Sequence, residues 1–164
     1  EHHSNLIPWQ QVAKAKGARV ITSTRNEVKK EALRSLGADI VIDTVSDWPA
    51  LLYDETVDLI VDSVGAATFQ RSLVVLKKGG RFVTFGSSTT DEGTFDIRTF
   101  FYNQQKIYGS TMASRDELRE LLTLMRHEKM KPLIDKIYSL EDANVAMESL
   151  EASTQVGKIV LKIE

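Results

Sequence analysis

The chain has 164 residues, of which 42% are hydrophobic and 27% are charged, and its formal net charge is -2. These values predict a globular domain with a substantial core and provide no basic field for binding nucleic acid or an anionic membrane. The sequence has no cysteine, which excludes disulfides and cysteine-ligated zinc. No apolar run approaches the ~20 residues of a membrane span and no signal peptide is recognisable, so the cytoplasm is the expected compartment.

The histidines do not predict a metal site. His2 and His3 lie in residues 1–11, which look like the remnant of an affinity tag or another non-native leader. Only His127 remains, and one histidine cannot form a cluster of metal ligands. We therefore predict neither a metal site nor a set of catalytic residues in this chain.

Short runs rich in valine, isoleucine and phenylalanine alternate along the chain with amphipathic segments. The runs lack the polar alternation of a half-exposed sheet, which is typical of parallel strands covered on both faces. The predicted strands are Arg19–Thr24, Asp39–Asp43, Val57–Ser63, Gly80–Gly86 and Lys106–Ser110.

Two of the amphipathic segments lie between these strands. Residues 26–37 place Val28 and Leu33 on one side of a predicted helix that ends at a glycine. Residues 66–80 predict a second helix, which ends in Lys77 and Lys78 before two glycines. Lysines and glycine suit a helix C-terminus electrostatically and sterically.

The order of these elements predicts the fold class. Repeated βα units of this length indicate a Rossmann-like α/β domain with a doubly wound parallel sheet over residues 12–130. Its last helix is expected over residues 114–129, where leucines recur at helical spacing. Residues 131–164 predict a short strand, a helix and a closing strand over Gly157–Ile163.

The end of the first predicted strand carries hydroxyls and a cation. Ser23, Thr24 and Arg25 end the run, Lys29 lies one turn further on, and no carboxylate stands before Glu27. In doubly wound sheets an acidic residue at this position binds the ribose of NAD, whereas hydroxyls with a cation suit the 2′-phosphate of NADP. A charge-assisted hydrogen bond of roughly 1.5–3 kcal/mol would give about a ten- to hundredfold preference for NADP. The alternative is a polar turn in which Thr24 and Glu27 form a capping box.

Four blocks of the sequence resemble the medium-chain dehydrogenase/reductase superfamily, in particular its quinone-oxidoreductase-like and alcohol-dehydrogenase-like members. The blocks are "LGADIVIDT", "VDLIVDSVGAATFQRSLVVLKKGGRFVTFGSST", "KIYGSTMASRDEL" and "YSLEDANVAMESLEASTQVGKIVLKI". The resemblance runs from about Val12 to Glu164. It implies a cofactor-binding domain, with NADP(H) preferred over NAD(H), of an oxidoreductase that transfers hydride to or from a carbonyl, enone, quinone or alcohol. It also implies a C-terminal segment, residues 131–164, that packs into a separate catalytic domain in intact members.

The resemblance implies a set of cofactor-binding positions. The end of the fold's fourth strand lies beside the adenosine, the end of the fifth near the nicotinamide ribose, and the loop after the sixth near the nicotinamide ring. A C-terminal basic residue can reach the pyrophosphate or a ribose. The corresponding residues are Ser23, Thr24, Arg25, Lys29, Ser63, Val64, Gly65, Phe85, Gly86, Ser87, Thr111, Met112 and Lys158. The alternatives are turn glycines, helix caps at Ser63 and Ser87, and an exposed strand cation at Lys158.

Two features of the superfamily are missing from this sequence. The opening strand and its G-x-G-x-x-G-type loop are not found, although this strand is central in the fold and its loop normally holds the pyrophosphate. The catalytic domain is missing too. We therefore expect the chain to bind at best the adenosine half of a cofactor and not to turn over. The terminal run from Gly157 is expected to pair with an exposed strand edge of its own chain or of a partner.

Two other functions remain open. Tyr102 and Lys106 have the Y-x-x-x-K spacing of short-chain dehydrogenases, with Ser88 and Thr89 upstream at about the distance of that family's catalytic hydroxyl. That chemistry requires both residues on one helix, whereas Lys106 begins a predicted strand and Tyr102 is expected to pack with neighbouring phenylalanines. The other possibility is a non-catalytic dimerisation or nucleotide-sensing module. In either case a homodimer is expected through the edge strand Lys106–Ser110.

Overall fold

The computed structural model describes residues 12–14, 16–128 and 130–163, so the predicted leader of residues 1–11 lies outside the described residues. The chain divides into two compact units. One is Thr44–Ser114, and the other combines the described parts of His2–Asp43 and Arg115–Glu164. None of the helices in the described ranges is long and apolar enough to cross a membrane.

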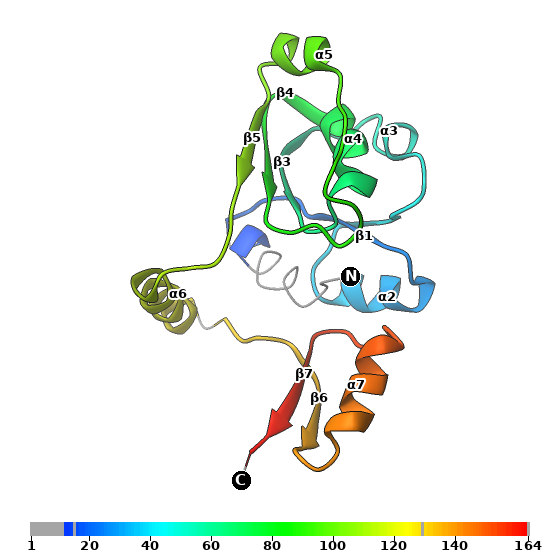
Figure 1. Ribbon diagram of the computed structural model, residues 1–164. Coiled ribbons are helices and arrows are strands. Elements are labelled where there is room, and N and C mark those ends of the chain that lie inside the picture. Colours follow the sequence, from blue (N-terminus) through cyan, green and yellow to red (C-terminus); the bar gives the residue numbers. More distant parts are fainter. Residues whose placement is uncertain (1–11, 15, 129, 164) are drawn as a thin grey trace. The chain divides into compact units, whose positions relative to one another are not determined.

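The unit Thr44–Ser114 contains a three-stranded parallel sheet in the order β3-β4-β5. Its strands are β3 (Val57–Asp62), β4 (Leu76–Thr84) and β5 (Lys106–Gly109), and its helices are α3 (Trp48–Leu51), α4 (Ala66–Val75) and α5 (Ile97–Tyr102). In Figure 1 the arrowheads of the three strands point the same way and α4 packs beside α3 and against β3 and β4. The three strands predicted in this part of the sequence are confirmed.

The core of this unit is built around Phe82 of β4, whose side chain is 0% exposed. The Phe69 ring of α4 meets it edge-on, with the ring centroids 5.1 Å apart. Phe95 packs edge-on against Phe69 at 5.7 Å and against Phe100 of α5 at 5.3 Å. Edge-to-face pairs of this kind contribute roughly 0.5–1.5 kcal/mol each beyond their area burial. The four rings therefore connect the sheet to the long segment that leads into α5.

The predicted end of the second helix is wrong. Helix α4 ends at Val75, and Leu76 is already extended, with φ -74° and ψ 127°. Lys77 and Lys78 lie in β4 instead, where Lys77 forms an ion pair with Asp58. The register of the β3–β4 pairing shifts in this region. The two lysines and the two following glycines therefore lie between the paired residues Leu76 and Arg81.

A glutamine distant in the sequence replaces the lysine and glycine cap that was expected at this helix end. The Gln105 side chain is buried, and its Nε2 donates to the carbonyl oxygens of Leu73 at 2.9 Å and Leu76 at 2.8 Å. The last carbonyls of a helix have no partner within the helix and must be satisfied in another way when they are buried. The Gln105 amide therefore allows α4 to pass directly into β4.

The second unit contains two separate pairs of parallel strands. β1 (Ile21–Thr24) pairs with β2 (Ile40–Asp43), and α2 (Glu27–Ser35) connects them. The predicted helix is confirmed, but its apolar side is only partly buried. Leu33 is 1% exposed, whereas Val28 is 86% exposed.

The chain ends in a βαβ unit. After α6 (Arg115–His127) come β6 (Ile134–Ser139), α7 (Ala143–Glu151) and β7 (Lys158–Lys162). β7 pairs in parallel with β6, with Ile137 opposite Val160. The terminal run therefore pairs with a strand of its own chain, which is one of the two pairings that were predicted for it.

The parallel sheets and connecting helices confirm the predicted Rossmann-like α/β class. Among the described residues, β2 is the strand partner of β1, and β4 is the strand partner of β3. In the doubly wound order, an opening strand lies between the strands that correspond to β1 and β3. No such strand is found among the described residues.

We expect Gln105→Met to destabilise the chain by about 2 kcal/mol or more, because it keeps the side-chain bulk and leaves two buried carbonyls without their donor. Urea denaturation of both proteins measures the difference. The matched control is Gln70→Ala on the exposed side of α4, which should change the midpoint little. Equal midpoints for the Gln105 and Gln70 variants would contradict the capping role.

Candidate functional site

A buried carboxylate organises the turn that follows β3. Asp62 Oδ1 accepts the backbone N–H groups of Val64 at 3.0 Å and Gly65 at 2.8 Å. Its Oδ2 accepts the hydroxyl of Thr68, in the first turn of α4, at 2.6 Å. Asp62 is 7% exposed and Thr68 is 1% exposed, so water competes little for these bonds. The Asp62 side chain therefore holds the backbone of the turn from Ser63 to Gly65 in place.

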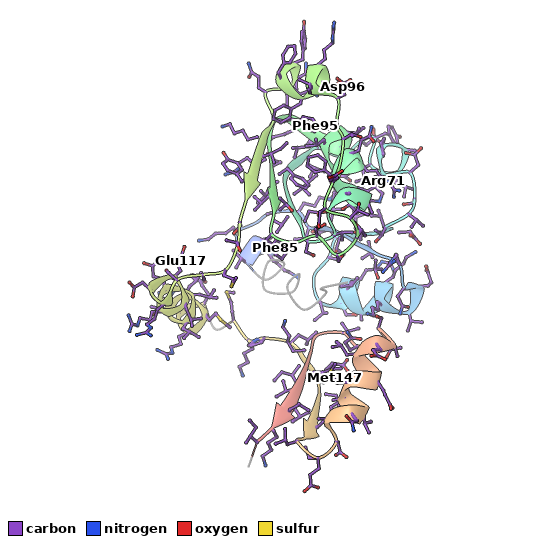
Figure 2. The ribbon with its side chains drawn as sticks, viewed as in Figure 1. Arg71, Phe85, Phe95, Asp96, Glu117 and Met147 are labelled. Carbon is purple, nitrogen blue, oxygen red and sulfur yellow. The ribbon has the colours of Figure 1, made fainter. Side chains whose placement is uncertain are left out.

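The segment that follows β4 crosses this turn and bonds to it. The Val64 carbonyl accepts the Ser88 N–H at 3.1 Å and the Thr89 hydroxyl at 2.9 Å. The Thr89 oxygen also accepts the N–H of Ala67 at 3.4 Å. Just before the two segments cross, the Phe85 N–H donates to the Asp62 carbonyl at 3.1 Å. This bond continues the hydrogen bonding between β3 and β4. Figure 2 labels Phe85 at this end of the unit.

Two glycines allow the close approach of the two backbones. A Cβ added at Gly65 would lie 2.6 Å from Ser87 Oγ and 3.1 Å from Ser87 Cα, and Gly65 has φ +89°. A Cβ at Gly86 would lie 3.3 Å from the carbonyl oxygen of Ser63. Glycine is thus favoured by both space and backbone conformation at Gly65, whereas at Gly86 a side chain would make a tight contact.

Ser63 and Ser87, which lie where the two segments cross, do not cap α4. The N-cap residue of that helix is Gly65, which has no side chain for the purpose. Ser87 Oγ donates to the Thr90 carbonyl at 2.7 Å, within its own segment. The alternative interpretation of Ser63 and Ser87 as helix caps is therefore wrong.

The third strand of this sheet ends beside the same segment. The Ser110 N–H donates to the carbonyl of Thr84 at 2.8 Å. Thr111 and Met112 follow in an exposed stretch, and Met112 is 94% exposed. The predicted positions in Thr44–Ser114 thus lie at the carboxyl ends of β3, β4 and β5, which is where open α/β sheets bind ligands.

A pocket of about 540 Å³ opens between the loop before α3 and the first turns of α4. Trp48, Ala66, Ala67 and Arg71 are among its lining residues. The Arg71 guanidinium donates to the carbonyl of Thr44 at 2.7 Å and connects the two walls (Figure 2). The sequence-based analysis did not identify this pocket, because its walls come from segments that no single motif spans.

The predicted phosphate-binding residues occupy different environments. Arg25 is exposed and Ser23 is half-buried. Thr24 is 0% exposed, and its Oγ1 accepts the N–H of Asn26 at 3.1 Å. Lys29 is 2% exposed. Of the four residues, Ser23 and Arg25 therefore present their side chains toward solvent most.

The capping-box interpretation of this turn is wrong. The N-cap of α2 is Asn26, whose Oδ1 accepts the N–H of Val28 at 3.0 Å. Glu27 instead forms an ion pair with Lys30 at 2.5 Å. An asparagine directly before the charged segment was the signal for this cap.

The structure also describes three other residues that the sequence singled out. Lys158 is exposed at the start of β7. Tyr102 ends α5 and Lys106 begins β5, so the two do not share a helix and the short-chain dehydrogenase interpretation is wrong. The Tyr102 ring contacts that of Phe101, with the centroids 6.3 Å apart, but it packs at the surface and is 76% exposed.

Comparison with known proteins establishes the family. A family model described as zinc-binding dehydrogenase matches residues 9–127. The chain belongs to the zinc-binding dehydrogenase family. Its relatives include alcohol dehydrogenases and coenzyme A thioester reductases, so membership of the medium-chain dehydrogenase/reductase superfamily is confirmed.

This zinc-binding dehydrogenase chain is 30% identical to the acryloyl-coenzyme A reductase of Sulfurisphaera tokodaii over 154 residues, which is 93% of this chain and 46% of the relative. It is similar to the crystal structure of an NAD-dependent alcohol dehydrogenase, with a TM-score of 0.82 and 34% identity over 96% of this chain and 48% of the other. It also resembles the 2-octenoyl-CoA carboxylase reductase CinF in complex with NADP and 2-octenoyl-CoA, with a TM-score of 0.83 and 27% identity over 96% and 40%. The chain thus spans less than half the length of each of these relatives.

The metal in the family's description has no ligand set in the part of the chain that the structure describes. No group of three or more His, Cys, Asp or Glu side chains there could hold a metal ion.

We expect Gly65→Ala to destabilise the chain by about 2–4 kcal/mol, since it adds a steric conflict with Ser87 to the cost of the positive φ. Thermal or urea unfolding gives the measurement. Gly79→Ala is the control, because Gly79 has φ +72° and open space around its Cβ position. If both variants lose the same stability, the close approach does not constrain the turn.

Proposed function

We propose that the chain is the NADP(H)-binding part of an oxidoreductase that transfers hydride between the nicotinamide and a carbonyl, conjugated enone, quinone or alcohol. Membership of the zinc-binding dehydrogenase family supports the reaction class. The observation that carries the proposal is the crossing of the Ser63–Gly65 turn by the Gly86–Thr89 segment at the carboxyl ends of β3 and β4. Ligands of open α/β sheets bind at such strand ends.

The chemistry of the residues at the crossing fits a dinucleotide. The two glycines let the two strand ends lie close together, and the serine hydroxyls at these ends can bond to ribose oxygens. We assign Ser63–Gly65 to the adenosine side, Phe85–Ser87 to the nicotinamide ribose, and Thr111 with Met112 to the nicotinamide ring. Lys158 is assigned to the pyrophosphate or a ribose. The cofactor supplies the hydride, and these residues bind and orient it.

We assign the adenine ring to the pocket beside α3. The pocket begins at Ala66 and Ala67, immediately after the Ser63–Gly65 turn, and Trp48 is among its lining residues. The lining combines apolar residues with the polar residues Ser46, Asp47 and Gln70, so a planar ring with polar edge atoms can contact both kinds. Arg71, which bonds to Thr44, keeps the two walls of the pocket together.

The preference for NADP(H) rests on Ser23 and Arg25. Ser23 lies near the end of β1 and Arg25 directly follows that strand, where an acidic residue would favour NAD. Lys29 and Thr24 are buried and contribute to this proposal only through the shape of the turn. Solved relatives include one described as NAD-dependent and one in complex with NADP, so both cofactors occur among similar proteins.

The substrate class is proposed from the relatives. An acryloyl-coenzyme A reductase and a 2-octenoyl-CoA carboxylase reductase both act on a double bond conjugated to a thioester carbonyl. An enoyl thioester is therefore the first substrate to test, and an alcohol is the second. Because the chain spans less than half of these relatives, we propose that it binds cofactor without turnover on its own. A cytoplasmic location is part of the same proposal.

Calorimetric titration of the chain with 2′-phospho-AMP and AMP tests the phosphate assignment. We expect the phosphorylated nucleotide to bind at least about tenfold more tightly, because one charge-assisted hydrogen bond contributes roughly 1.5–3 kcal/mol. Arg25→Ala should remove this difference and leave AMP binding unchanged. Quenching of Trp48 fluorescence in a Trp9→Phe background reports occupation of the adenine pocket.

The matched control is Arg34→Ala, which removes an arginine of α2 that is half-exposed and paired with Glu31. It should leave both affinities unchanged. If 2′-phospho-AMP and AMP bind equally, or if the Arg34 variant behaves like the Arg25 variant, the assignment of the 2′-phosphate to Arg25 is wrong.

A non-catalytic dimerisation or nucleotide-sensing module is the second candidate. It is favoured by the position of β5 at the edge of its three-stranded sheet in the described residues. Tyr108 on this strand is 47% exposed, so apolar surface accompanies the open edge. An edge of this kind is a template for pairing with a second copy across a two-fold axis.

Tyr108→Lys should convert the proposed homodimer to a monomer, because the two charges would face each other across the pair of strands. Sedimentation velocity over a range of concentrations measures the change. Tyr102→Lys is the control, since this tyrosine is 76% exposed and lies on α5, outside the edge strand. A wild-type chain that is monomeric at every concentration rules out the homodimer through β5.

A further inference from the structure

We infer that Thr89 is a positioning residue for the cofactor-facing backbone after β4. Its hydroxyl links that segment to the turn after β3 and to α4 at the same time. The inference rests on the proposed function, because it concerns the segment assigned to the nicotinamide ribose. Thr89 belongs to none of the positions predicted for cofactor binding.

The Thr89 hydroxyl uses both its donor and its acceptor capacity. It donates to the carbonyl of Val64 at 2.9 Å, and it accepts the N–H of Ala67 at 3.4 Å. Ala67 lies in the first turn of α4, whose N-cap is Gly65 and has no side-chain cap. Thr89 thus supplies, from 22 residues away in the sequence, the hydroxyl that an ordinary N-cap would provide.

The surrounding segment has few other attachments. Gly86, Ser87, Ser88 and Thr89 are all exposed, and the next helix begins only at Ile97. Within the described residues, the Ser88 N–H and the Thr89 hydroxyl are the hydrogen bonds that connect this stretch to the turn. Without the Thr89 hydroxyl, one hydrogen bond at Ser88 and the packing against Gly65 would hold the stretch, which gives it more freedom to move.

The geometry of the crossing makes such a rotation relevant to the cofactor. The Ser63 carbonyl and Gly86 are close enough that a Cβ at Gly86 would lie 3.3 Å from that oxygen. A movement of Gly86 would therefore change the position of its backbone against the Ser63 turn and shift the Phe85–Ser87 residues that are assigned to the nicotinamide ribose. If only part of the population holds the competent arrangement, the apparent Kd rises in inverse proportion to that fraction.

The test compares three variants with the wild-type chain. Thr89→Val keeps the side-chain shape and removes the hydroxyl, and Thr89→Ser restores the hydroxyl. Thr90→Val is the matched control, since the Thr90 hydroxyl meets only the Glu92 carbonyl, at 3.5 Å. The probes are NADPH, which reaches the nicotinamide side, and 2′-phospho-AMP, which does not.

We expect Thr89→Val to raise the Kd for NADPH about tenfold and to raise the Kd for 2′-phospho-AMP clearly less. A smaller effect on 2′-phospho-AMP is expected because Thr89 also bonds to Val64 and Ala67, which are assigned to the adenosine side. Thr89→Ser should bind both probes as the wild type does, and so should Thr90→Val. Hydrogen exchange in the free chain should show faster exchange of the Ser88 amide in Thr89→Val only. A purely structural role would weaken both probes together.

Equal NADPH affinity in Thr89→Val and the wild type would overturn the inference, and so would an equal loss for both probes. A wild-type chain that binds neither probe would overturn the proposed function and this inference with it. Unchanged exchange at the Ser88 amide would overturn the positioning role alone, because this measurement requires no nucleotide. The two failures are therefore distinguishable.

Discussion

The carboxylate of Asp62 is the group on which the arrangement at the strand ends depends. It is nearly buried, and it satisfies the N–H groups of Val64 and Gly65 together with the hydroxyl of Thr68. An unpartnered buried donor costs roughly 1–3 kcal/mol, and the partly buried N–H groups of this turn would lose part of that stabilisation without Asp62. The turn in turn presents the Val64 carbonyl, to which the segment after β4 bonds. One acidic side chain thereby orders two loops.

The sequence was most informative where local chemistry decides the structure. The strands were predicted because their β-branched runs fit parallel strands whatever surrounds them. The end of α4 could not be predicted, because the group that satisfies its carbonyls is the side chain of Gln105, far along the chain. The exposure of Val28, on the predicted apolar side of α2, could not be predicted for a similar reason. A helical pattern shows which residues share a side, but not how far the covering structure extends.

The same distinction applies to the candidate site. Motif resemblance predicted Ser63–Gly65 and Phe85–Ser87 as cofactor-binding positions, which remain a proposal. It gave no structural role to Asp62 or Thr89, because their roles come from hydrogen bonds that link one loop to its neighbours. At the turn proposed to hold the 2′-phosphate, the sequence grouped Arg25 with Lys29, but the first is exposed and the second is buried. Burial of a lysine depends on its neighbours in space and has no reliable signal in one sequence.

The irregular start of β4 has a consequence for how this fold tolerates changes in length. The pairing of β3 with β4 shifts between Val57 and Leu59, so Lys77–Gly80 lie outside regular register. In a regular strand, one inserted residue would turn every following side chain to the opposite face, and Phe82 would leave the core. Here the irregular stretch can gain or lose a residue while the strand beyond Arg81 keeps its alignment. Relatives that differ in length between α4 and β4 can therefore share an identical core.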